Sequence, residues 1–224
     1  MKSRPILFST AMVKALLDGS KTQTRRTAKL SNSQCNGRGF ECLRKPSTRE
    51  FLPLVNGQWQ WKPAAGDDYK PYPNIAEYCP YGQPGDQLWV RENGWQRPER
   101  SEKDMRDGAD TWPPYIYDAD ETPAIEDWCR QHKWKRRPSI HMPRSACRLT
   151  LEITSVRIEH LNDISEEDAG AEGCGFLLAR HEYLDGNPDR SRKCFRILWE
   201  QINGPGSWNL NPYVWALEFK RIHP

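Results

Sequence analysis

The sequence predicts an α+β fold: a small, mostly antiparallel β-barrel with flanking helices and two long insertions. Several short segments alternate apolar and polar residues with the two-residue period of a β-strand, and helical patterns lie between them. The strand predicted over residues 147–161 changes the parity of its apolar positions midway, which is typical of a bulge where a sheet curls. The length fits a single domain over residues 1–224 that carries large insertions.

The chain opens with a predicted strand over residues 5–9 and a helix over residues 11–18. Apolar residues recur at helical spacing across that helix, with Ser9 or Thr10 available as N-cap and Gly19 as the C-terminal stop. The residues after Gly19 alternate in the manner of a strand. We therefore expect a strand–helix–strand unit at the start of the fold.

The second strand of that unit carries an unusual density of polar side chains. It combines one lysine, two threonines and two arginines, namely Lys21, Thr22, Thr24, Arg25 and Arg26. Such a set suits the binding of a polar or anionic ligand, and it also suits acyl chemistry. It equally describes a solvated basic turn that leads into an edge strand, and composition alone favours this second interpretation.

Two stretches interrupt the periodic pattern and are predicted to be insertions, over about residues 28–84 and 96–137. The first is rich in Gly, Pro, Asn and Ser but also carries several Trp and Tyr residues, which disordered segments usually lack. The second contains a predicted strand over residues 115–117 and a helix over residues 124–131. We expect both insertions to pack beside or over the mouth of the barrel.

The seven cysteines have irregular spacing, which argues for reduced thiols. Cys35 and Cys42 form a C-x6-C pair that does not match the short pairs of ordinary zinc sites, although Cys79 or His141 could complete one. We expect no metal and no cofactor. The chain shows no secretory signal and no apolar stretch of about 18 residues, so we expect a cytoplasmic protein with no membrane segment.

Glu92 ends a strand predicted over residues 86–92. Leu88 and Val90 share its direction, so Glu92 would line the barrel mouth if these two residues point inward. An ion pair, with Arg25 or Arg91 as the partner, explains the residue equally well.

Glu172 lies at the far end of a short helix that Ser165 begins as N-cap, with Asp168 three residues on. A carboxylate at a helix C-terminus gains nothing from the helix dipole. A functional site therefore explains this position better than helix stability does, and an ordinary surface glutamate is the alternative.

The stretch that follows the predicted helix in the second insertion places four cations around one indole: Lys133, Trp134, Lys135, Arg136 and Arg137. Charges for phosphates and a flat ring for a base are typical of a nucleic-acid contact. A solvated basic loop is an equally good interpretation. The net charge of +3 is too balanced to decide between the two.

The last two elements are an amphipathic helix over residues 189–202 and a strand over residues 213–219. The apolar face of the helix, Phe195, Leu198, Trp199 and Ile202, is predicted to face the core. The aromatic face of the strand is better explained as core than as a base-stacking surface.

Four stretches, in this order, resemble the ASCH domain, a PUA-like fold associated with RNA. They are residues 5–26, which end in Lys-Thr-Gln-Thr-Arg-Arg, residues 85–92 (Gly-Asp-Gln-Leu-Trp-Val-Arg-Glu), residues 164–173, and residues 215–219. The longer chain resembles the ASCH-type proteins of bacteriophages and prophages. The resemblance implies a PUA-like barrel built from roughly residues 3–27, 85–95 and 140–223.

Some small bacterial ASCH proteins are amidohydrolases that remove the acetyl group from N-acetylated cytidine. Their catalytic lysine, threonine and glutamate fall on Lys21, Thr24 and Glu172. The resemblance thus implies that Lys21 is the base, Thr24 the nucleophile and Glu172 the acid, while Thr22, Arg25, Arg26 and Glu92 would contact the substrate. The alternatives are a non-catalytic module that binds RNA or a modified nucleobase, and a ribonuclease.

Overall fold

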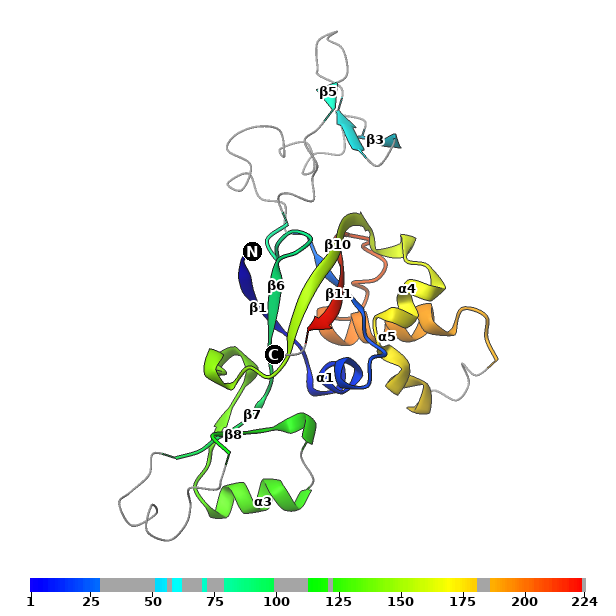
Figure 1. Ribbon diagram of the computed structural model, residues 1–224. Helices are drawn as coiled ribbons and strands as arrows, with labels where there is room; N and C mark the ends of the chain where they lie inside the picture. The colour runs from blue at the N-terminus through cyan, green and yellow to red at the C-terminus, as the bar shows by residue number, and fades with distance from the viewer. Residues whose placement is uncertain are drawn as a thin grey trace.

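The computed structural model describes residues 1–28, 51–55, 58–61, 70–71, 79–98, 113–120, 123–180 and 186–222. Its centre is a five-stranded sheet with the strand order β1-β6-β10-β11-β2 (Figure 1). These strands span Ser3–Leu7 (β1), Gln87–Arg91 (β6), Thr150–His160 (β10), Tyr213–Ile222 (β11) and Gln23–Thr27 (β2). β1 runs parallel to β6, and the other three neighbouring pairs are antiparallel.

The sheet confirms the α+β class, but it is open. β1 and β2 lie at opposite edges, so the described strands do not close into the predicted barrel. The predicted bulge is present: the register of β10 against β11 shifts between Ile153 and Ser155, where the apolar parity changes. One extra residue in a strand increases its local twist, which explains how so long a strand curls.

Helix α1 (Thr10–Leu17) connects the two edges of the sheet. Its N-cap is Ser9, whose hydroxyl accepts a hydrogen bond from the backbone N–H of Met12 at 3.4 Å. Gly19 follows the helix with a φ of +82°, a conformation that costs glycine little. The chain then returns to the helix, because Lys21 N donates to Ala15 O at 2.9 Å. This turn sets where Lys21 begins its course toward β2.

Helices α4 (Glu166–Ala171) and α5 (Arg190–Asn203) pack together beside the sheet (Figure 1). Ser165 caps α4 as predicted, with its hydroxyl 3.1 Å from Asp168 N. The α5 residues predicted to face the core are buried, with the exception of Ile202, which is 61% exposed because it lies in the last turn of the helix. The two helices place Glu172 and one apolar wall next to β2.

A second, three-stranded sheet with order β8-β7-β9 lies with helix α3 below the main sheet in Figure 1. Its elements span Gly94–Gln96 (β7), Tyr115–Tyr117 (β8), Pro123–Gln131 (α3) and Lys135–Arg137 (β9). The predicted strand over residues 115–117 and the helix after Pro123 are therefore confirmed.

A third sheet pairs β3 (Phe51–Val55), β4 (Gln58–Trp61) and β5 (Lys70–Pro71) inside the first predicted insertion. Most of that insertion, including Cys35 and Cys42, lies outside the described residues.

Across the described ranges, we find no helix with both the length and the apolar character that a membrane crossing requires.

Candidate functional site

Lys21 and Glu172 pair as an isolated antiparallel β-bridge, although they lie 151 residues apart in the sequence. Lys21 Nζ donates to Glu172 Oε2 at 3.0 Å and to the backbone carbonyl of Glu172 at 2.7 Å. Its third hydrogen bond goes to Gln23 O at 2.7 Å. Three acceptors around one nitrogen match the three donors of an ammonium group.

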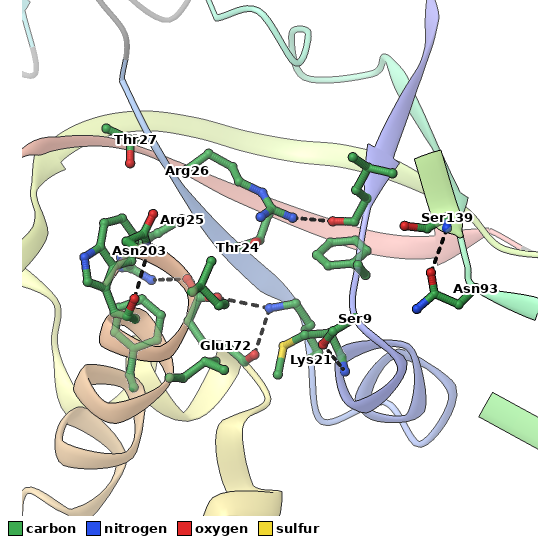
Figure 2. Close-up of a pocket in the computed structure, with 17 residues that line it drawn as sticks. Ser9, Lys21, Thr24, Arg25, Arg26, Thr27, Asn93, Ser139, Glu172 and Asn203 are labelled. Carbon is green, nitrogen blue, oxygen red and sulfur yellow. Dashed lines mark hydrogen bonds and ion pairs between the residues drawn. The ribbon is translucent and has the colours of Figure 1, made fainter. Parts of the chain in front are cut away.

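Both residues line a cavity of about 290 Å³ between β2, α1 and α5 (Figure 2). This volume is at the lower edge of the roughly 300–1,000 Å³ of small-molecule sites. The polar lining includes Lys21, Thr24, Arg25, Arg26 and Glu172, and the apolar lining includes Phe8, Met12, Phe195, Leu198 and Trp199. A mostly apolar wall with a few convergent polar groups is typical of a binding or active site.

Burial controls the charge of Lys21, whose side chain is 1% exposed. Removal from water disfavours the ammonium form and lowers the pKa of Lys21 below its ordinary value of 10.5, while the charge and hydrogen bond of Glu172 oppose this shift. The Nζ also lies 5.4 Å from the centre of the Phe8 ring, a contact that favours the ammonium, but desolvation is the larger effect. The lysine is therefore easier to deprotonate than a surface lysine.

Arg25 connects three carboxylates from different elements, and its own side chain is 0% exposed. It donates to Glu159 at 2.7 Å, to Asp168 at 2.9 Å and to Glu172 at 3.2 Å. Arg157 also pairs with Glu159 and Asp168. The arginine thus holds the carboxylate oxygen of Glu172 that Lys21 does not bind, and it ties β2 to β10 and α4.

Asp168 belongs to this network, because it accepts hydrogen bonds from both Gln23 and Arg25. Burial alone would raise the pKa of Asp168, but the hydrogen bond from Gln23 and the charges of Arg157 and Arg25 outweigh burial and lower it. Asp168 therefore stays ionised and helps to neutralise the buried Arg25.

The threonines and arginines of the Lys21–Arg26 segment differ in their placement. Thr24 is buried in the cavity wall, and its backbone pairs with Leu217 of β11. Arg26 also lines the cavity, donates to Leu7 O at 2.6 Å and lies over the Phe8 ring. Thr22 is exposed and outside the cavity lining, so its predicted contact with substrate does not fit this placement. Thr22 precedes β2, and its backbone N–H donates to Ala171 O at 2.9 Å.

Glu92 is buried, but it does not line the cavity. Its two carboxylate oxygens accept hydrogen bonds from Arg148 at 3.1 and 2.9 Å. Burial raises the pKa of Glu92, and the hydrogen bond and charge of Arg148 oppose the shift. Of the two interpretations of Glu92, the ion pair is correct and the contact with substrate is not supported. The predicted partners, Arg25 and Arg91, are replaced by Arg148.

The basic stretch at residues 133–137 is partly structural. Trp134 is 4% exposed and packs with Trp95 and Cys129, so its ring does not face solvent as base stacking would require. Arg136 pairs with Asp118, and Arg137 donates to Gln96 at 2.7 Å. Lys133 and Lys135 are exposed. A phosphate contact by these two lysines stays a prediction.

Sequence reasoning missed several members of the site. Glu159 and Gln23 looked like ordinary polar positions of strands, and Asp168 looked like part of a helix cap. Trp199 was predicted to be core, yet it also lines the cavity. Figure 2 shows Asn203 of α5 at one end of the cavity and the hydrogen-bonded pair Asn93 and Ser139 at the other. A polar residue that faces inward on a curled strand is the signal that could have identified Glu159.

Within the described ranges, no three His, Cys, Asp or Glu side chains are grouped so that they could hold a metal ion. Cys79 is a buried free thiol. Comparisons with models of known protein families, with curated proteins and with solved structures found no match to this chain.

Proposed function

We propose that this protein is an amidohydrolase that removes the acetyl group from an N-acetylated cytidine. One observation carries the proposal: Lys21, Thr24 and Glu172, which distant parts of the sequence supply, line the same cavity. They provide a buried amine, a hydroxyl and a carboxylate, which are the groups that amide hydrolysis by side chains requires.

The buried Lys21–Glu172 pair can exist in two protonation states. Transfer of one proton from the ammonium to the carboxylate would give a neutral amine and a carboxylic acid, and the removal of Lys21 from water favours the loss of its proton. The direct contact at 3.0 Å between Nζ and Oε2 provides the path for the proton. The lowered pKa of Lys21 supports its role as a base.

The reaction then follows from these groups. Neutral Lys21 takes the hydroxyl proton of Thr24, and Thr24 Oγ1 attacks the acetyl carbonyl carbon. Glu172 gives its proton to the leaving amine nitrogen, and cytidine departs. Water then attacks the acetyl–threonine ester and gives one proton to the Glu172 carboxylate, while the Lys21 ammonium returns its proton to Thr24 Oγ1 and acetic acid leaves. Arg25 orients Glu172 throughout, and Arg26 is placed to contact the substrate at the cavity wall.

The same proposal places the chain in the ASCH family, with the open sheet as the core of a PUA-like barrel. The order of the motifs supports this assignment. The stretches that resemble the family fall on the β1–α1–β2 unit, on β6, on α4 with Glu172, and on β11, which are parts of the main sheet or of its cavity.

A second candidate function is a module that binds a modified nucleobase or RNA without cleaving it. The observation that favours it is the complete pairing of the buried charges: Lys21 Nζ makes three hydrogen bonds, and both oxygens of Glu172 are occupied. A fully paired network forms a rigid wall that suits binding alone.

Release of cytidine from N4-acetylcytidine by the purified protein, measured by chromatography, separates these two functions. We expect Lys21→Met, Thr24→Val and Glu172→Gln each to reduce the rate at least about 10²-fold. The losses should not add in double variants, because the three groups act together. The matched controls are Lys14→Met and Thr22→Val, which alter exposed residues outside the cavity lining and should retain full activity. Binding without release in the parent protein would favour the module.

A further inference from the structure

Trp199 carries a buried hydrogen-bond donor that is not used inside the protein. The residue lines the cavity from α5 and is 5% exposed. Its indole Nε1 is buried and has no hydrogen-bond partner. Among the described side chains that line the cavity, no other has a buried polar atom in this condition. Buried N–H groups are almost always paired, so an unpaired one at a cavity wall suggests a partner that arrives with a ligand.

Phe195 packs against the ring of Trp199, and Asn203 binds the backbone of Trp199. Phe195, one turn earlier on α5, packs against the indole with ring centroids 6.1 Å apart and the planes tilted by 56°. The backbone carbonyl of Trp199 accepts a hydrogen bond from Asn203 Nδ2 at 3.1 Å. A donor held in place before the ligand arrives loses little entropy when it forms a hydrogen bond.

We infer that Trp199 recognises the ligand, and that its indole N–H donates a hydrogen bond to a carbonyl oxygen of the bound molecule. The inference rests on the proposed function and names a specificity residue for the same cavity. An indole N–H donates and never accepts, so the matching group must be an acceptor. An uncharged carbonyl suits the apolar wall around Phe195 and Leu198 better than an anion, which would lose far more solvation there.

An N-acetylated cytosine offers two such oxygens, one on the pyrimidine ring and one on the acetyl group. In Figure 2, Lys21 and Thr24 lie between the α5 end of the cavity, which Asn203 marks, and the end with Asn93 and Ser139. If Thr24 engages the acetyl group, the ring extends to one of these two ends. At the α5 end, the ring carbonyl would be near Trp199.

The test measures binding and therefore does not depend on turnover. Trp199→Phe removes the N–H and keeps an aromatic ring, and β-(3-benzothienyl)alanine at position 199 keeps the indole shape while sulfur replaces the N–H. Both changes are made in the Thr24→Val background, so that acetylated ligands are not consumed. Calorimetry then gives the Kd of N4-acetylcytidine, of cytidine, which has the ring carbonyl alone, and of 4-acetamidopyrimidine, which has the acetyl carbonyl alone.

We expect both changes to raise the Kd of N4-acetylcytidine about 3- to 10-fold, which is the effect of losing one neutral hydrogen bond. If cytidine loses as much affinity, the hydrogen bond goes to the ring carbonyl. If 4-acetamidopyrimidine loses as much affinity, the bond goes to the acetyl carbonyl. Benzothienylalanine at position 95 is the matched control, because Trp95 Nε1 is also buried and unpaired but lies outside the cavity lining. It should leave every Kd unchanged.

Unchanged affinities in both position-199 variants, with unfolding curves like that of the parent, would overturn the inference. So would an absence of binding by all three ligands. Neither result depends on hydrolysis. Conversely, a parent protein that binds through Trp199 but releases no cytidine would refute the proposed amidohydrolase and leave this inference intact.

Discussion

Glu172 binds Lys21 Nζ at two points, through Oε2 at 3.0 Å and through its backbone carbonyl at 2.7 Å. The backbone contact does not depend on the identity of the side chain at position 172. Glu172→Gln should therefore leave Lys21 anchored while it removes the negative charge that opposes the effect of burial.

The first prediction concerns the pKa of Lys21. Because the charge of Glu172 raises this pKa against desolvation, Glu172→Gln should lower it further below 10.5. NMR titration of the Lys21 side chain measures the value in each protein. Glu167→Gln, which alters another glutamate of the same region, is the control. A rise in the pKa of Lys21 after Glu172→Gln would show that the carboxylate does not act as described.

The second prediction concerns stability and pH. A lysine whose pKa is lower in the folded state than in the unfolded state binds fewer protons when folded. The unfolded chain then takes up more protons, so the free energy of unfolding rises as the pH increases toward 10.5. Lys21→Met should flatten this part of the pH dependence in denaturant titrations, and Lys14→Met should not. Identical slopes in the parent and Lys21→Met would contradict the assigned direction.

The third prediction concerns Gly173, the residue after Glu172. Its φ is +71°, and an added Cβ would lie 2.7 Å from Lys21 Cβ and 2.9 Å from Ala15 Cβ. Gly173→Ala should lower the free energy of unfolding by roughly 2–4 kcal/mol, from left-handed backbone strain and overpacking. It should also reduce activity, because Lys21 must move. Gly175→Ala is the control, since nothing lies within 4 Å of an added Cβ there. Equal thermal midpoints for the two variants would refute the prediction.

The fourth prediction concerns Arg25. Arg25→Met removes a cation with a side chain that is 0% exposed, and Glu172 then keeps only Lys21 as its ion-pair partner. Loss of one member of a buried ion pair lowers the free energy of unfolding by about 3–5 kcal/mol. The midpoint of urea unfolding should therefore move to a clearly lower urea concentration. Arg130→Met breaks an exposed pair with Glu126 and should cost at most about 0.5 kcal/mol. A small effect at position 25 would mean that the network contributes little to the fold.

The fifth prediction concerns nucleic acid. Arg136 and Arg137 are occupied by Asp118 and Gln96, which leaves Lys133 and Lys135 to contact phosphates. If they bind single-stranded RNA, the double change to Ser should reduce the log–log salt dependence of affinity by about 1.4 units, at roughly 0.7 per contact. Trp134→Phe should reduce stability and leave that slope unchanged. An unchanged slope in the lysine variant would identify the segment as a solvated surface.

Local sequence patterns predicted the individual strands and helices better than they predicted whether the sheet closes into a barrel. The parity change in β10 located the bulge, and Ser165 located the start of α4, because both signals depend on residues close together in the chain. Whether the edges of the sheet meet depends on curvature accumulated over several strands. The sequence therefore did not show that β1 and β2 stay apart.

The composition of the site was predictable in part. Lys21, Thr24 and Glu172 were named through a resemblance to a family, and no periodic pattern in the chain joins them. Arg148 as the partner of Glu92 could not be inferred, because the two residues lie 56 positions apart and meet through packing alone. Trp134 has the composition of a nucleic-acid contact, but the fold buries its ring.

The strand order also has a consequence for the newly made chain. β2, which carries Thr24 and Arg25, has a single neighbour in the sheet, β11, and that strand spans Tyr213–Ile222. On the ribosome, β2 must therefore wait without a sheet partner until β11 has been synthesised. The cavity wall that β2 forms cannot be fixed in the sheet before then, so a nascent chain that stops before β11 carries the residues of the site without its architecture.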